Sequence, residues 1–68
     1  MLYSCKYEMA SVWESMRGGG SVARMKRGEV CFALGPTDNK DYVLVLFNGV
    51  IGWVAIQNLE EVEGALPL

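Results

Sequence analysis

The chain has 68 residues, a formal net charge of −2, and a composition of 51% hydrophobic and 21% charged residues. This length allows one small domain, because domains usually run to roughly 100–150 residues, and the composition is that of a globular chain rather than a disordered one. The chain has no histidine and only two cysteines, which excludes a zinc finger and histidine-dependent nucleophiles, so we expect no enzyme, no metal and no cofactor.

Residues 2–7 are predicted to form a first short strand, and the segment after them admits two interpretations. Four of its apolar residues fall at helical spacing: Met9, Val12, Trp13 and Met16. Residues 8–17 could therefore form a helix ended by the glycines at 18–20. The favoured interpretation is a long irregular hairpin loop with these glycines at its tip, whose apolar residues fold over an open end of a barrel.

The strongest local signals lie in the middle of the chain. Residues 29–34 are predicted to form a strand, which a Gly-Pro pair stops. Residues 42–47 and 50–54 are rich in β-branched and aromatic residues and flank the Asn-Gly pair at 48–49. Because Asn-Gly tolerates the positive φ angles of a type I′ turn, these two runs predict a tight β-hairpin.

A short last strand is predicted over residues 60–63. The chain then has five short strands and no room for a crossover helix, which indicates an all-β domain spanning residues 1–68. A small barrel is the architecture expected for such a set, because closing the sheet on itself removes its free edges.

Three motifs of the chain follow a pattern known from one family of small barrels. Residues 52–59 read Gly-Trp-Val-Ala-Ile-Gln-Asn-Leu, residues 2–3 read Leu-Tyr, and residues 26–29 read Lys-Arg-Gly-Glu. These motifs resemble the ending, the first strand and the turn after the long RT loop of Src-homology-3 (SH3) domains. The resemblance implies a five-stranded SH3-like barrel with a long RT-type loop and a short 3-10 turn over residues 55–58.

The binding groove of the SH3 family is degenerate in this chain. In peptide-binding members, aromatic rings and a proline form grooves that receive a polyproline helix. Here Ala55 stands at the position of that proline, Asn58 at the last tyrosine and Cys5 at the second tyrosine of the first strand. The aromatic residues that remain at groove positions are Tyr3, Tyr42 and Trp53. The chain is at least as similar to bacterial and viral SH3-type domains, which bind varied partners.

Two predicted strands are apolar on both faces. Residues 30–34 and 43–47 are apolar at successive positions, although a strand with one wet face alternates apolar with polar residues. If the odd-numbered residues of the second run face the core, Leu44 and Leu46 point outward. They would then lie beside either the odd-numbered or the even-numbered residues of the first run. The apolar residues of segment 8–17 could cover this face, or it could be exposed and bind another protein.

The leading hypothesis is a non-enzymatic protein-interaction module. A free-standing SH3-like barrel of this size is expected to act as a small accessory subunit or modulator of a bacterium or virus, and to bind a protein partner or itself. The predicted contact residues are Tyr3, Tyr42, Leu44, Leu46, Trp53 and Asn58.

The alternative hypothesis is a nucleic-acid-binding barrel that uses a basic segment without any acidic residue. Its cations are Arg17, Arg24, Lys26 and Arg27, with Trp13 or Tyr7 available for base stacking. The acidic net charge disfavours this function, because such binding depends on neutralising phosphates.

No targeting or membrane segment is predicted. The N-terminal residues lack a basic region followed by an apolar run, so they do not form a signal peptide, and no stretch reaches the roughly 20 apolar residues of a membrane span. We therefore expect a cytoplasmic protein with reduced cysteines and no membrane partner. The missing signal peptide also disfavours a third function, recognition of a cell-wall peptide or glycan.

Overall fold

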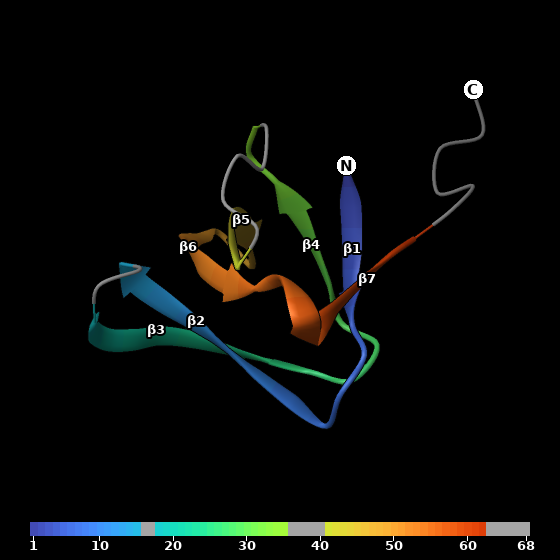
Figure 1. Cartoon of the computed structure of the whole chain (residues 1–68), viewed down its shortest axis with the longest axis horizontal. Coiled ribbons are helices and arrows are strands. Elements are labelled where there is room, and N and C mark those ends of the chain that lie inside the picture. Colours follow the sequence, from blue (N-terminus) through green and yellow to red (C-terminus); the bar gives the residue numbers. More distant parts are fainter. Residues whose placement is uncertain (16–17, 36–40, 63–68) are drawn as a thin grey trace.

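The computed structural model describes residues 1–15, 18–35 and 41–62, which form strands and one short 3-10 turn. In chain order the elements are β1 (Leu2–Cys5), β2 (Met9–Ser15), β3 (Gly18–Lys26), β4 (Val30–Ala33), β5 (Tyr42–Phe47), β6 (Val50–Ala55), η1 (Ile56–Asn58) and β7 (Leu59–Glu61). All seven strands belong to one antiparallel sheet in the order β3-β2-β6-β5-β4-β1-β7 (Figure 1). The predicted all-β class is confirmed, with seven strands in place of five.

The two extra strands come from the segment predicted as a helix or an irregular loop. β2 and β3 form a long paired hairpin, with register shifts in its outer half. In β2 the side chains of Ala10 and Val12 are buried, whereas Met9 and Trp13 are exposed, which is the alternation of a strand. The helix is therefore wrong, and the loop is corrected to a β-hairpin. Met16, the last residue of the helical spacing, lies outside the described residues.

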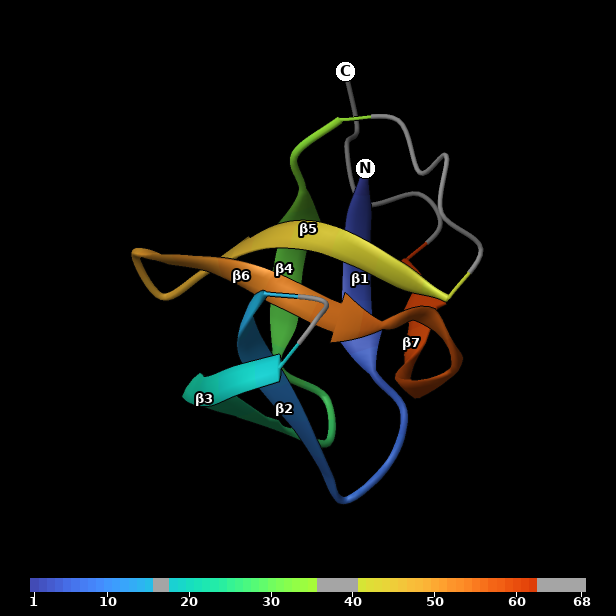
Figure 2. The ribbon, with the colours of Figure 1, turned by 60° about the vertical axis from the view of Figure 1, so that its left-hand side comes forward.

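The predicted β5–β6 hairpin is confirmed. Asn48 and Gly49 both have positive φ angles, of 48° and 77°, as a two-residue type I′ turn requires. The turn fixes the register, so that Phe47 lies opposite Val50 and Val43 opposite Val54. In Figure 2 these two strands lie side by side and run across the direction of β4 and β1, as expected for a strongly twisted sheet.

The end of the described chain returns to its beginning. The 3-10 turn η1 falls where it was predicted, and β7 begins one residue earlier than expected because Leu59 is buried and lies opposite Cys5 of β1. The Val62 amide donates a hydrogen bond of 3.0 Å to the carbonyl oxygen of Leu2. Residue 63, the last of the predicted strand, lies outside the described residues.

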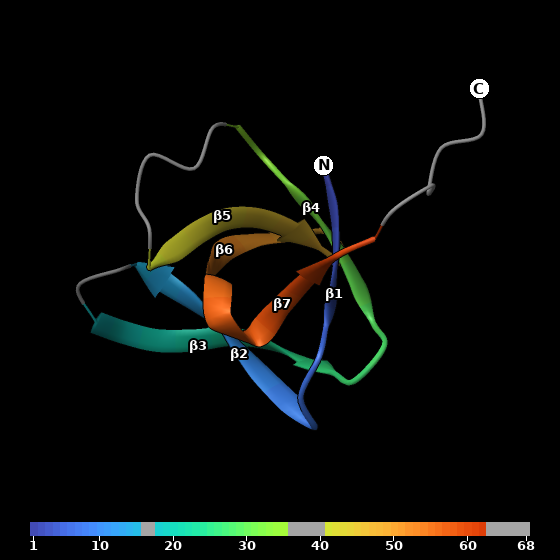
Figure 3. The ribbon, with the colours of Figure 1, turned by 45° about the vertical axis from the view of Figure 1, so that its right-hand side comes forward.

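The sheet curls around a single apolar core, which gives the domain a barrel-like form (Figure 3). Each of the seven strands contributes at least one buried apolar side chain, and η1 contributes none. The buried side chains are Cys5, Ala10, Val12, Met25, Cys31, Val43, Val45, Phe47, Val54 and Leu59. The core thus holds the odd-numbered residues of β5, as predicted from the alternation of its faces.

Gly52 is the point at which β2 comes closest to β6. A Cβ atom placed on Gly52 would lie 2.5 Å from Cγ1 of Val12 and 2.8 Å from the carbonyl oxygen of Trp13. The backbone of β2 occupies this space, so only a residue without a side chain fits. Close approach at Gly52 also sets Trp13 of β2 opposite Trp53 of β6.

We predict that Gly52→Ala lowers the free energy of unfolding by at least about 2 kcal/mol, because the methyl group overlaps a backbone atom that cannot move aside cheaply. Urea denaturation followed by tryptophan fluorescence measures the change. Gly20→Ala is the matched control, since nothing lies within 4 Å of a Cβ atom there. Equal effects of the two substitutions on the free energy of unfolding would contradict a steric conflict between β2 and a side chain at position 52.

Candidate interaction surface

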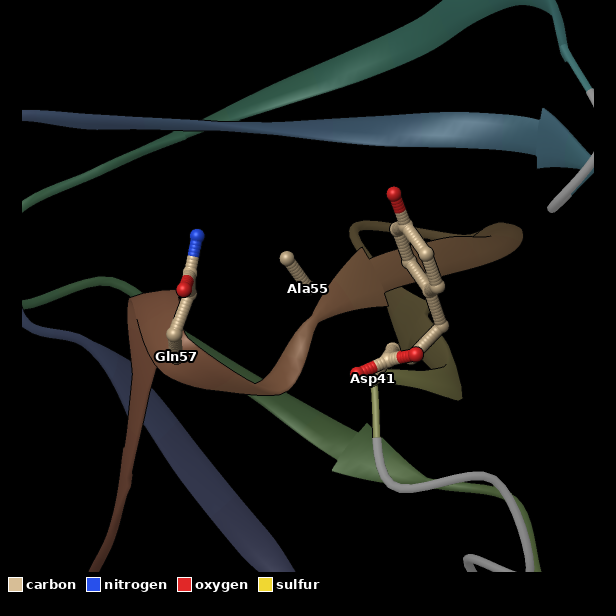
Figure 4. Close-up of a pocket in the computed structure, with 4 residues that line it drawn as sticks. Asp41, Ala55 and Gln57 are labelled. Atoms are coloured by element: carbon tan, nitrogen blue, oxygen red, sulfur yellow. The ribbon is translucent and has the colours of Figure 1, made fainter.

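A pocket of about 290 Å³ lies where β5 begins and β6 ends. It is lined by Asp41, Tyr42, Ala55 and Gln57. Tyr42 and Ala55 are cross-strand partners, and the amide of Ile56 donates a hydrogen bond of 2.9 Å to the carbonyl oxygen of Asp41. Figure 4 shows Ala55 between Gln57 on one side and Asp41 on the other. The hairpin register and η1 together therefore build this pocket.

Only part of the predicted groove is assembled around the pocket. Tyr42 lines it, and Trp53 lies two residues before Ala55 on the same side of β6. Tyr3 instead packs against the core, and the carbonyl oxygen of Asn58 accepts a hydrogen bond from the amide of Lys6. The pocket residues that the sequence prediction missed are Asp41, Ala55 and Gln57.

Leu44 and Leu46 point away from the core, as predicted. Their neighbours on β5 are buried at 0–5% exposure, while both leucines remain half-buried on the opposite side of the strand. Leu46 lies opposite Phe32 of β4 and Ile51 of β6. This register settles which residues of β4 lie beside the leucines, because Phe32 shares their side and Cys31 is in the core.

The register aligns apolar side chains across several strands. One row runs from Ile51 through Leu46 and Phe32 to Leu2 of β1. A second row runs from Trp13 through Trp53 to Leu44, whose carbonyl oxygen accepts a hydrogen bond of 2.9 Å from the amide of Leu34. With Val30, these residues form what we call the outer apolar face: Leu2, Trp13, Val30, Phe32, Leu34, Leu44, Leu46, Ile51 and Trp53.

The described part of the β2–β3 hairpin leaves several residues of the outer apolar face exposed. Val12 is in the core, Met9 is 53% exposed, and Trp13 is itself a member of the face. Of the residues predicted to cover Leu44 and Leu46, Val12 and Met9 therefore do not lie across them, whereas Trp13 lies in the row of Leu44. Met16 lies outside the described residues. Phe32 is 52% exposed and Ile51 59% exposed.

The predicted basic residues lie on another part of the molecule. Arg24 and Lys26 share one side of β3, which is at the end of the sheet, and Arg27 follows in the turn; all three are exposed. The amide of Lys26 donates a hydrogen bond of 2.6 Å to a carboxylate oxygen of Glu29, so an acidic side chain lies beside the basic ones. Arg17 lies outside the described residues.

Comparisons with known proteins assign no family to the chain. No protein-family model matches it. No curated protein matches it either. Across the described ranges, no group of three or more acidic or cysteine side chains could hold a metal ion, and no helix is long and apolar enough to cross a membrane.

Both cysteines are free and buried on the core side of the sheet. The Cys5 thiol donates to the carbonyl oxygen of Tyr7 at 3.2 Å. Burial, and to a smaller extent the neighbouring Cys5, raise the pKa of Cys31 from 9.0 to about 11. Cys31 is therefore a protonated thiol at neutral pH, packed among the other buried side chains of the core.

The raised pKa of Cys31 predicts a stability that declines in alkaline solution. The unfolded chain loses this proton near pH 9 and the folded chain near pH 11. The contribution of the protonated Cys31 thiol to the free energy of unfolding is thus complete below pH 9. It is lost between pH 9 and 11, at up to about 1.4 kcal/mol per pH unit. Urea denaturation at pH 8, 9, 10 and 11 measures this slope. In Cys31→Ala the additional slope should vanish, and identical slopes in the two proteins would contradict the assignment.

Proposed function

We propose that the chain is a non-enzymatic protein-interaction module, a small accessory subunit or modulator that binds a protein surface through its outer apolar face. The observation that carries the proposal is the outer apolar face itself, which extends over β1, β2, β4, β5 and β6 without a charged side chain. A sheet whose two faces are both apolar normally has both faces covered. Large exposed apolar patches on small chains mark interaction sites.

The size of the outer apolar face is sufficient for protein binding. Its exposed members, Trp13, Val30, Phe32, Leu34 and Ile51, retain 37–59% of their surface. Since a large apolar side chain offers about 150–250 Å² when fully exposed, they present about 400 Å² together. Burying that area contributes roughly 10 kcal/mol before the cost of association is subtracted. Association costs about 4–15 kcal/mol, so this gain offsets much of the cost of binding a partner.

The pocket extends this surface at one end. Tyr42 lies on the same side of β5 as Leu44 and Leu46, and Ala55 lies on the same side of β6 as Trp53. At about 290 Å³ the pocket is at the lower limit of small-molecule sites, which run to roughly 300–1,000 Å³. Its size suits one side chain of a protein partner better than a separate substrate.

We further propose that the domain is SH3-like. The order of its elements supports this assignment: a long hairpin follows β1, a tight hairpin follows β4, and a 3-10 turn precedes a last strand that pairs with β1. Gly52 and Trp53, at the start of the motif that resembles the family, lie at the crossing with β2. Because Ala55 replaces the groove proline, we expect partners other than proline-rich peptides.

Photo-cross-linking in the source cell tests the proposed function. A benzoylphenylalanine residue at position 32 or 51 should form covalent adducts with a protein, because both positions lie in the outer apolar face. The matched control is position 9, which is equally exposed but lies outside the face. Absence of adducts from positions 32 and 51, or equal yields from position 9, contradicts the proposal.

A second candidate function is single-stranded nucleic-acid binding at one end of the β2–β3 hairpin. The amide of Gly28 donates a hydrogen bond of 2.9 Å to the carbonyl oxygen of Cys5, which brings the turn after β3 beside Lys6 and Tyr7. Tyr7 is exposed, and the ammonium group of Lys6 lies 5.6 Å from the centre of its ring. Lys26 precedes that turn and Arg27 lies in it, so cations and an aromatic ring meet there.

The two functions separate in a fluorescence titration with a labelled single-stranded oligonucleotide at low salt. If the outer apolar face is the binding surface, we expect no signal below about 100 μM of protein, where even non-specific nucleic-acid binders respond. Micromolar binding that is lost in the Lys26→Glu, Arg27→Glu variant would instead favour the second function.

A further inference from the structure

We infer that residues 64–68, which lie beyond the described part of the chain, fold back over the nearest part of the outer apolar face and cover it until a protein partner displaces them. The inference rests on the proposed function, since it describes how access to the same face is regulated. It is carried by the position of Val62, by the sequence that follows it and by the exposed side chains beside it.

The last described residue, Val62, lies in line with the outer apolar face. Tyr3 of β1 is opposite Glu61 of β7. The next pair is Leu2 and Val62, and the Val62 amide donates a hydrogen bond of 3.0 Å to the carbonyl oxygen of Leu2. Leu2 in turn lies opposite Phe32 of β4. Because residues opposite each other point to the same side of a sheet, Val62 continues the row of Phe32 and Leu2.

The strands beside Val62 leave apolar side chains exposed. β4, β1 and β7 follow one another in the sheet and lie side by side in Figure 1. Phe32 of β4 is 52% exposed, and Leu34, which follows this strand, is 41% exposed. A cover for these side chains crosses β1 alone, so it does not depend on how the sheet curls towards β5 and β6.

The sequence after Val62 suits such a cover. Residues 64–68 read Gly-Ala-Leu-Pro-Leu and include no charged side chain. Gly64 can adopt the backbone angles of a sharp turn, and Leu66 favours an extended conformation because it precedes a proline. In an extended segment, residues 66 and 68 point to the same side. Leu66 and Leu68 can therefore pack together on the apolar side chains of β1 and β4.

The segment is long enough to reach these side chains. Val62 and Phe32 are separated by two strand spacings, which amount to about 10 Å. Leu66 follows Val62 by four residues, which span up to about 13 Å when extended. Leu68 reaches further, to Phe32 and beyond it to Leu46. Attachment at Val62 also gives both leucines a high effective concentration at the face, which a separate protein does not have.

The cover is expected to be reversible. Ordering five residues costs conformational entropy, which opposes the gain from burying two leucines against the ring of Phe32. A partner that contacts the whole outer apolar face can therefore displace the segment. A cover that is closed two-thirds of the time weakens the apparent affinity of the face about threefold, because only the open fraction binds.

Two measurements on the full chain test the inference. Nuclear Overhauser effects should connect the methyl protons of Leu66 or Leu68 with the ring protons of Phe32. The double variant Leu66→Ser, Leu68→Ser should bind the dye anilinonaphthalene sulfonate at least about threefold more tightly than the wild type in a fluorescence titration, because its face is open. Ala65→Ser is the matched control, since residue 65 points away from the face in an extended segment. This control should bind the dye like the wild type.

Unchanged or weaker dye binding by the double variant would overturn the inference, and so would the absence of these nuclear Overhauser effects. Circular dichroism checks that the strands are intact in both variants. Cross-linking from position 32 in the source cell separates the cover from the proposed function. Protein adducts whose yield is the same in the wild type and the double variant overturn the cover alone. If neither protein gives adducts, the proposed function fails, while the contacts with Phe32 still support the cover.

Discussion

The close approach of β2 to β6 at Gly52 is the constraint on which the rest of the domain depends. Because no side chain occupies this position, Val12 packs into the core and the backbone at Trp13 lies against β6. The β2–β3 hairpin thereby closes one side of the core. The same approach places Trp13 beside Trp53, so a packing requirement of the inside also shapes the outside of the sheet.

Local rules were enough to predict most of the sheet. The Asn-Gly pair specified the β5–β6 hairpin and its register, and alternation along β5 separated Val45 in the core from Leu44 outside it. The β2–β3 hairpin could not be predicted in this way, because apolar residues at 9, 12 and 13 fit a helical period as well as a strand. Tertiary contacts decide between the two, and the contact at Gly52 involves residues far apart in the sequence.

The outer apolar face was predictable in kind but not in extent. Alternation alone placed Leu44 and Leu46 on the outside, whereas the inclusion of Phe32 and Ile51 depends on the pairing of β4 and β6 with β5. The pocket escaped prediction for a similar reason. Its members Asp41 and Gln57 come together only because Tyr42 and Ala55 are opposite each other.

Both terminal strands of the sheet carry charged side chains, which disfavour the pairing of like edges. β3, at one end, bears Arg24 and Lys26, and β7, at the other, bears Glu60 and Glu61. Pairing of β3 with β3, or of β7 with β7, from a second copy would bring like charges together. The uncharged outer apolar face thus lies between two charged terminal strands, which oppose the pairing of like edges.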